Sequence, residues 1–444
     1  MSHTGRIAWT TLAVLLLFAA CIEEATDPLV TPRTAAEKTR TEDRGPGDGG
    51  GRPAPHVYIW KDLAALQTLP MAGTAWSNLE TYAQNALVLG GPNLGTFEVS
   101  LFDKDSDADV LALAKALVAL RIPGGWTTWT YRWHVQLAIQ EIMAEWPNPS
   151  AIDCTNEPLA VARNLTSYII AADYAGLDEP VATQFRQWLG TMLDEPLSEQ
   201  PDCIRNDRSL HQIMRERPNN WGTMAMAALA AVATYRNDAT LLTEVRHVFD
   251  GWLGDRAEYA GFLYGDLCWQ PNPTAPVGIA PVQSVIVAGT CTYPMDGALP
   301  EELRRSELCD PGTSTCSIDC NPGMAGTQCL VTACPGNTCS IAGGRMQVNV
   351  YLHGAIAGAA VCAEILSHRG YPDVWQWENQ ALRRAAQWLL ERHNADPAMG
   401  WWFSGNDSFI PWLLNRAYGT SFPTSQDINV GRNMDFTDWT HPPQ

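Results

Sequence analysis

Residues 218–235 read PNNWGTMAMAALAAVATY, and this stretch decides the fold that we expect. From Met224 to Tyr235 nearly all side chains are small or apolar, which is typical of a helix packed closely on every side. Two consecutive amides, Asn219 and Asn220, precede it. One amide can cap the free backbone N–H groups, and the other can project from the helix start, where the dipole favours an anion. We therefore expect a buried central helix over 221–236 that begins with either a plain cap or a ligand site.

Helical periodicity dominates on both sides of this segment from Val57 onward. No strong period-2 pattern predicts strands, and no sequence repeat of fixed length is present. Consecutive antiparallel helix pairs over residues 57–444 predict an all-α fold, namely an α/α toroid or incomplete α/α barrel, whose cleft lies where the inner helices begin. The other expected helices cover 111–120, 133–146, 164–177, 183–193, 239–253, 351–369 and 377–393.

The composition excludes one class of partner. The chain has 444 residues, of which 46% are hydrophobic and 17% charged, and its formal net charge is −19. Binding nucleic acid needs a basic face, so nucleic acid is not an expected partner. We expect a monomer that uses neither a cofactor nor a metal ion.

The first twenty residues are typical of an export signal. Arg6 supplies the positive start, residues 12–18 the apolar core and Ala19-Ala20 the small residues before cleavage. Cys21 follows, so the segment resembles a bacterial lipoprotein signal, in which this Cys is lipidated. That pattern prefers Leu where this chain has Phe18, so ordinary secretion stays an alternative. We expect a signal peptide over 1–20, a lipidated Cys and flexible linker over 21–56, and attachment to the bacterial cell envelope, at the outer membrane or the periplasmic face.

Six cysteines fall within residues 309–339. This Gly- and Pro-rich stretch has almost no apolar core of its own, so it predicts a disulfide-stapled insertion over 308–342. A zinc cluster is the alternative, and the exported setting makes it less favourable. Two further bridges could join Cys154 to Cys203 and Cys268 to Cys291. Cys362 lies in a helical pattern, and we expect it to be a buried free thiol.

Three segments carry a family resemblance. They are NNWGT at 219–223, DGALPEELRR at 296–305 and YLHGAIA at 351–357, and in this order they resemble the alginate lyase family of polysaccharide lyases. The family pattern is Asn-Asn-His, then DG-x-LP-x-E-x-x-R, then a Tyr that opens a helix of small residues. Supporting similarity lies at 163–176, 185–189 and 433–441. The resemblance covers residues 57–444 apart from the Cys-rich insertion, and it implies β-elimination on a uronic-acid polymer.

The resemblance also implies roles for individual residues. Asn220 and Arg305 would hold and neutralise the sugar carboxylate, for which the planar, permanently charged guanidinium is well suited. Tyr351 would donate a proton to the leaving oxygen and could also abstract the α-proton. Asn219 and Arg304 would contact the substrate beside them. The alternatives are an exposed helix-end Arg for Arg305 and a half-buried core aromatic for Tyr351.

The chain departs from the family pattern at Trp221, where the family has His. Indole cannot abstract a proton, so Trp221 could only contact the substrate. His353 could replace the base only if Tyr351 precedes the helix, because residues i and i+2 do not share a helix face. His211 is a second candidate base, and an elimination that uses Tyr351 alone remains possible.

A second group of aromatic residues follows Pro123-Gly124-Gly125. Trp126, Trp129, Tyr131 and Trp133 could stack on sugar rings, but clustered tryptophans in a chain with 18 of them are more often core, and we expect core here. We keep Trp126 and Trp129 as candidate substrate contacts.

The sequence therefore predicts a lipid-anchored polysaccharide lyase that acts on an anionic, alginate-like polysaccharide. Its acidity repels such a polymer at long range, although salt screens that repulsion beyond roughly 8–10 Å. One alternative is a non-catalytic glycan-binding surface lipoprotein on the same fold. Another is a glycoside hydrolase, for which Asp266 with Glu301 or Glu302 would supply the two carboxylates.

Overall fold

The structure is a computed structural model. It describes residues 57–90, 96–122, 124–145, 157–195, 209–262, 350–395, 400–425 and 434–442, and also 279, 285–288, 291–294, 296–299, 302, 318–319, 330–331 and 397. The predicted signal peptide, the lipidation site Cys21 and the linker lie outside these residues. So do all six cysteines of the predicted insertion, whose pairing stays a prediction.

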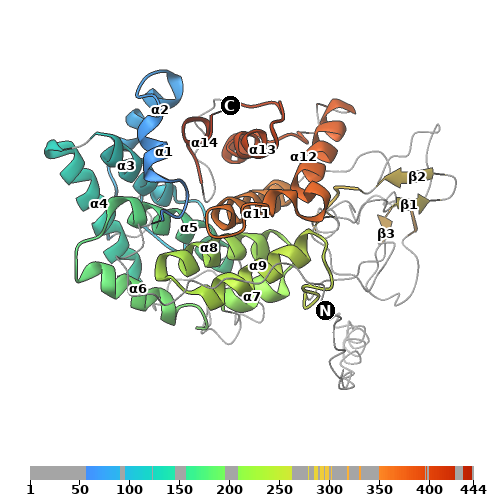
Figure 1. Ribbon diagram of the computed structural model, residues 1–444, viewed down its shortest axis with the longest axis horizontal. Coiled ribbons are helices and arrows are strands. Elements are labelled where there is room, and N and C mark those ends of the chain that lie inside the picture. Colours follow the sequence, from blue (N-terminus) through green and yellow to red (C-terminus); the bar gives the residue numbers. More distant parts are fainter. Residues whose placement is uncertain are drawn as a thin grey trace, which may run out of the picture. The chain divides into compact units, whose positions relative to one another are not determined.

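Helices dominate the described residues, so the all-α expectation is confirmed (Figure 1). In chain order the helices are α1 (Leu63–Thr68), α2 (Thr74–Ala83), α3 (Ala108–Arg121), α4 (Gly125–Glu145), α5 (Glu157–Ala175), α6 (Val181–Thr191), α7 (Leu210–Glu216), α8 (Asn220–Arg236), α9 (Ala239–Leu253), α11 (Val350–Ser367), α12 (Trp377–Ala395), α13 (Ile410–Tyr418) and α14 (Thr437–Thr440). Two short antiparallel strand pairs accompany them: β1 (Val285–Ala288) with β2 (Cys291–Pro294), and β3 (Ile318–Asp319) with β4 (Leu330–Val331).

The helices differ in how much of their surface is buried. α3, α5, α8 and α11 are buried along almost their whole length, whereas α4, α6, α9 and α12 alternate buried and exposed positions. This agrees with their composition, because a helix that is apolar all round must be covered all round. The buried helices pack in series, α3 on α5, α5 on α8 and α8 on α11. The free buried thiol predicted at Cys362 is confirmed on α11.

α8 and α11 approach so closely that their backbones touch. A Cβ added at Gly358 would lie 2.5 Å from the backbone N of Met224 and from the carbonyl carbon of Thr223. One turn earlier, a Cβ added at Gly354 would lie 3.5 Å from Cβ of Asn220. Residue numbers increase along both helices from the first contact, Gly354 with Asn220, to the second, Gly358 with Met224. α8 and α11 therefore run parallel and begin at the same end of the pair.

The end of the chain packs back onto its beginning. The indole N–H of Trp439 on α14 donates to the carbonyl of Pro70 at 2.8 Å, and its ring lies 5.3 Å from that of Trp76 on α2. The next turn places His441 edge-on to Trp60 at 5.2 Å. Contacts therefore run from α11 through α13 and α14 to α2, and from there through α3, α5 and α8 back to α11.

A buried carboxylate holds this C-terminal segment on α11. Oε1 of Glu364 accepts from Nε2 of His441 at 2.9 Å and from Nε2 of His368 at 3.1 Å. Burial alone would raise the pKa of Glu364, but the charge and hydrogen bonds of the two imidazoles lower it well below its usual range. Burial lowers the pKa of His441. Both groups therefore bind fewer protons in the folded chain than in the unfolded one.

We expect Gly358→Ala to lower the free energy of unfolding by about 1–3 kcal/mol or more, because the new methyl group must push two helix backbones apart. Gly354→Ala is the matched control. Its methyl group makes ordinary contacts and improves helix propensity, so it should be neutral or stabilise the fold by up to about 1 kcal/mol. Denaturant unfolding followed by circular dichroism measures both. Equal stability of the two variants would contradict the backbone contact.

The stabilisation that Glu364 supplies as a carboxylate should be present above the ordinary pKa of a glutamate, about 4.3, and lost as the pH falls below it. Glu364→Gln keeps the shape and an acceptor oxygen but removes the charge. We therefore expect the wild-type chain to have the higher Tm at pH 6 and this advantage to shrink toward pH 3. The exposed Glu391→Gln on α12 is the control and should follow the wild type. A difference in Tm that does not change with pH would contradict the assignment.

Candidate functional site

The start of α8 is built as the two amides predict. Asn219 has extended backbone angles and is the N-cap, and its side-chain oxygen accepts from the backbone N–H of Trp221 at 3.0 Å. Asn220 is the first residue of the helix, and its side chain faces Gly354 of α11. Both amides are buried, with 6% and 3% of their surface exposed. The capping role of Asn219 is confirmed, and the Asn220 side chain lies buried between the start of α8 and α11.

Glu302 supplies the second partner of this helix start. Its side chain is 1% exposed, and Oε1 accepts from the backbone N–H of Asn220. A carboxylate is stabilised there by the positive end of the helix dipole. The acidic residue of the 296–305 segment thus contacts the first residue of α8, although the two lie far apart in the sequence. The sequence analysis considered Glu302 only as a possible hydrolase carboxylate and did not predict this contact.

The rest of the 296–305 segment is described only in part. Asp296 forms an ion pair with Arg384 of α12, and Gly297, at φ +85°, lies against the same helix. A Cβ on Gly297 would lie 2.3 Å from the carbonyl oxygen of Arg384, which explains why this position is glycine. Arg304 and Arg305 lie outside the described residues, so their predicted roles stay predictions.

Tyr351 and His353 lie on different faces of α11. The helix begins at Val350, so Tyr351 is already helical and does not precede the first turn. Tyr351 lies three residues before Gly354, hence on the side of α11 that faces the start of α8. It is partly buried.

His353 faces the segment that follows α12. Its Nε2 lies 3.1 Å from the carbonyl oxygen of Trp401, and because a carbonyl can only accept, this nitrogen carries the proton. Nδ1 lies 3.7 Å from Oδ2 of Asp407, and the ring packs against Phe403. The side chain is 5% exposed. Both ring nitrogens of His353 are thus directed at residues 401–407 and away from Tyr351.

His211 belongs to another cluster. Its Nδ1 lies 3.0 Å from Asp194, which follows α6, and its Nε2 lies 2.8 Å from Glu244 of α9. Glu244 also accepts from Arg215 at 2.5 Å. The imidazole is therefore held between two carboxylates where α6, α7 and α9 meet.

One acidic group that the sequence did not single out lies on α9, whose last turn contacts the segment before α8. The indole N–H of Trp252, at the end of α9, donates to the carbonyl of Pro218 at 3.0 Å. Asp250 precedes Trp252 by two residues and is buried, and burial together with the charge of Glu378 raises the pKa of Asp250 to about 7. Groups with such shifts are found at functional sites but also in structural ion-pair clusters. Nothing in the sequence of an amphipathic helix distinguishes Asp250, because its burial is a tertiary effect.

The candidate aromatic contacts fall into two places. Trp221 is partly buried and packs against the core at the first turn of α8. Trp126 and Trp129 lie on α4, which packs against α3, α5 and α6, and 77% and 56% of their surface is exposed. Their interpretation as core is therefore wrong. The structure brings Asn219, Asn220, Glu302 and the start of α11 together, and it places Trp126 and Trp129 on a separate surface.

Comparison with known proteins identifies no relative: no family model, no curated protein and no solved structure matches the chain. Over the described helices, no segment is both long and apolar enough to cross a membrane. Among the residues with described positions, no three His, Cys, Asp or Glu side chains form a group that could hold a metal ion.

We expect Asn219→Ala to cost roughly 1 kcal/mol of stability, because it removes the side-chain acceptor for the N–H of Trp221. Asn219→Ser is the matched control, since serine is an equally good N-cap and should keep nearly all of the stability. Urea unfolding measures both. If serine is as destabilising as alanine, Asn219 acts by something other than capping.

Proposed function

We propose that the chain is a polysaccharide lyase that cleaves a uronic-acid-containing, alginate-like polymer by β-elimination. One observation carries the proposal: residues of the three family-like segments meet at one place. Glu302 accepts from the N–H of Asn220, and the Asn220 side chain packs against Gly354, three residues after Tyr351. These residues are widely separated in the sequence, and this lyase chemistry requires an amide and a phenol on one substrate.

The arrangement of helices supports an α/α toroid as the scaffold. The buried helices α3, α5, α8 and α11 contact one another in series, each with a half-exposed helix next to it in the chain. The contacts through α13, α14 and α2 continue this series back to α3. In a toroid the inner helices run parallel, as α8 and α11 do, and their starts line the substrate cleft.

β-Elimination removes the proton α to the sugar carboxylate, and the electron pair of that C–H bond forms a double bond to the β carbon. The bond from the β carbon to the glycosidic oxygen breaks, and this oxygen takes up a proton. Asn220 and Arg305 would donate hydrogen bonds to the carboxylate as negative charge develops on it, which is typically the largest single electrostatic contribution. Tyr351 would protonate the leaving oxygen.

The proton abstraction would fall on Tyr351 as well. Trp221 has no basic group, His353 is directed at Trp401 and Asp407, and His211 is held between Asp194 and Glu244. A single phenol can act as both base and acid when the two groups lie on one face of the sugar.

Glu302 has two consequences in this proposal. By accepting the N–H of Asn220 it fixes the first residue of α8, and with it the direction of the Asn220 side chain. It also adds a negative charge next to an anionic substrate, so Arg304 and Arg305 would be needed to offset it. Asn219 uses its side-chain oxygen in the cap, which leaves its amide nitrogen for substrate contact.

A non-catalytic glycan-binding protein on the same fold is the second candidate. It is favoured by Trp221, which stands where the family has a base. It is also favoured because His353 and His211 both contact other groups of the protein. A glycoside hydrolase is supported less, because Glu302 serves the backbone of Asn220. Asp266 and Glu301 lie outside the described residues, so their part in this alternative stays a prediction. From the sequence we also propose export and lipid anchoring at Cys21 in the cell envelope, with ordinary secretion as the alternative.

The test is ultraviolet absorbance of digests of a panel of uronic-acid polymers, because elimination creates a conjugated double bond. Tyr351→Phe removes only the hydroxyl, so the chain should fold normally while kcat falls about 10²–10⁴-fold, equivalent to about 3–5 kcal/mol of barrier. Tyr371→Phe is the control. Tyr371 is a partly buried tyrosine that packs on Trp377, and this variant should keep full activity.

Three outcomes would contradict the proposal. Release of reducing ends without absorbance would indicate hydrolysis. Binding of the polymers without any cleavage would favour the non-catalytic alternative. Retention of more than about a tenth of kcat by Tyr351→Phe would remove Tyr351 from the mechanism.

A further inference from the structure

The outer face of α4 carries a row of side chains that are exposed except for Leu137, which is half-buried. Trp126, Trp129 and Trp133 are 77%, 56% and 41% exposed, and the helical period places Leu137, Gln140 and Ala144 on the same side. From Trp126 to Ala144 this α4 stripe is about 27 Å long. Single exposed aromatics are common, but three contiguous tryptophans mark a binding surface.

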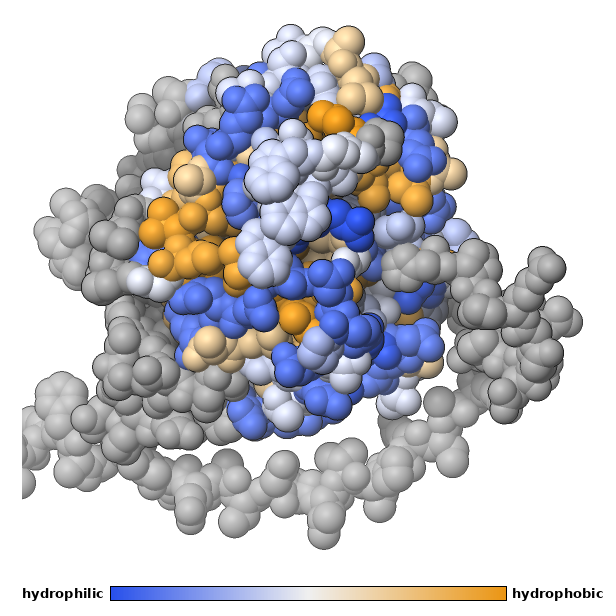
Figure 2. All heavy atoms as spheres, turned by 90° about the vertical axis from the view of Figure 1, so that its left-hand side faces the viewer, coloured by the Kyte–Doolittle hydropathy of each residue, from blue (hydrophilic) through white to orange (hydrophobic). Residues whose placement is uncertain are grey.

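The three indole rings are nearly parallel. Trp126 and Trp129 have centroids 5.1 Å apart with planes 30° apart, and Trp129 and Trp133 have centroids 6.1 Å apart with planes 4° apart. Figure 2 views the side of the molecule on which α4 lies. Side chains of intermediate hydropathy, drawn pale, stand there between hydrophobic and hydrophilic patches. Aromatic rings in this arrangement present apolar faces along one line.

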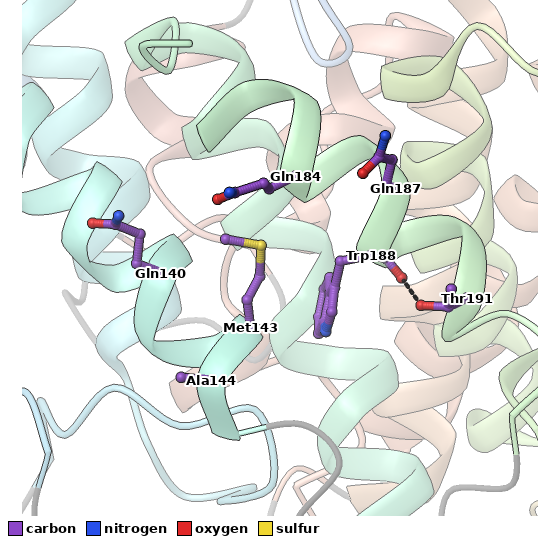
Figure 3. A pocket seen from close by; sticks show the side chains of 7 residues that line it. All are labelled: Gln140, Met143, Ala144, Gln184, Gln187, Trp188 and Thr191. Atoms are coloured by element: carbon purple, nitrogen blue, oxygen red, sulfur yellow. Dashed lines mark hydrogen bonds between the residues drawn. The ribbon is translucent and has the colours of Figure 1, made fainter. Parts of the chain in front are cut away.

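The stripe leads into a groove between α4 and α6, and Figure 3 shows its walls. The groove has a volume of about 530 Å³, and Met143 and Trp188 form its apolar part. Three glutamines, Gln140, Gln184 and Gln187, also line the groove, and in Figure 3 the side chain of Gln184 extends toward Met143. The hydroxyl of Thr191 donates to the carbonyl of Trp188 at 2.8 Å.

The described residues that line the groove include no charged side chain, although the whole chain has a net charge of −19. Nearby guanidinium groups have other partners: Arg186 pairs with Glu179 at 2.9 Å, and Arg132 donates to the carbonyls of Ala175 and Gly176. A polyanion or a cationic peptide would therefore find no opposite charge in the groove. A membrane surface is a poorer match, because interfacial helices combine an aromatic and aliphatic face with a polar face rich in Lys and Arg, whereas the polar residues that are described in this groove are Gln and Thr.

We propose that the α4 stripe and the α4–α6 groove form a binding site for an uncharged polysaccharide chain, separate from the Asn220–Tyr351 site. A sugar ring presents an apolar C–H face, which stacks on indole, and edge hydroxyls, which both donate and accept hydrogen bonds. Amide side chains offer both functions without charge. The proposal does not depend on the lyase function, since it uses none of the same residues.

The test is co-sedimentation of the purified chain with insoluble uncharged polysaccharides of several linkage types, at low and at high salt. We expect binding to at least one of them that does not change with salt, because no ion pair is involved. Trp129→Ala, at the centre of the stripe, should weaken it about tenfold or more, and Gln187→Ala should weaken it by a smaller factor. Met71→Ala is the matched control, because Met71 is an exposed apolar residue outside the stripe and should leave binding unchanged.

The outcomes separate this site from the proposed lyase site. Tyr351→Phe should bind as the wild type does, whether or not the chain cleaves any polymer. The proposal is overturned if no uncharged polysaccharide is bound, if Trp129→Ala binds as well as the wild type, or if binding is confined to anionic polymers and lost at high salt. Sedimentation with phosphatidylcholine vesicles that Trp129→Ala abolishes would overturn it in favour of a membrane surface. Circular dichroism checks that the variants fold, which these exposed positions should allow.

Discussion

The backbone contact between α8 and α11 is the constraint on which the candidate site depends. Glycine at 358 lets the two helices touch, and the same approach brings Asn220 against Gly354. A larger residue at 358 would separate not only two helices but also the amide of one from the phenol-bearing turn of the other. The glycines of α11 therefore permit close packing and also determine which polar groups can meet.

At the start of α8, backbone N–H groups that could bind an anion already have acceptors within the protein. Asn219 and Glu302 already accept from the first N–H groups, so a ligand carboxylate cannot rely on them. Recognition at this place must come from side chains that reach over the helix start. The α4–α6 groove differs in chemistry, because its described lining combines aromatic and amide side chains without a charged one. The two places thus differ in the ligands that they could recognise.

Local patterns predicted much of the fold. α9 has the predicted bounds, Ala239–Leu253, and α8 begins one residue earlier than expected, because apolar period and caps are sequence-local. α1, α2, α7, α13 and α14 were missed, since short helices depend on packing more than on their own sequence. Tertiary contacts were harder to predict from the sequence than helices. Composition cannot distinguish a buried from an exposed tryptophan, so Trp126 and Trp129 were expected in the core although they are exposed, and the partners of Glu302 and His353 lie in segments remote from them in the sequence.

Residues 434–442 pack against α2 and α11, so this part of the core can form only after they have been synthesised. Trp60 and Trp76 are synthesised more than 360 residues before Trp439 and His441, which cover them. Until then both indoles remain without their final neighbours, and uncovered apolar surface of this kind is where partly made chains aggregate or recruit chaperones. The nascent protein therefore carries a late-closing core, and its lifetime before closure depends on the rate of translation as well as on the rate of folding.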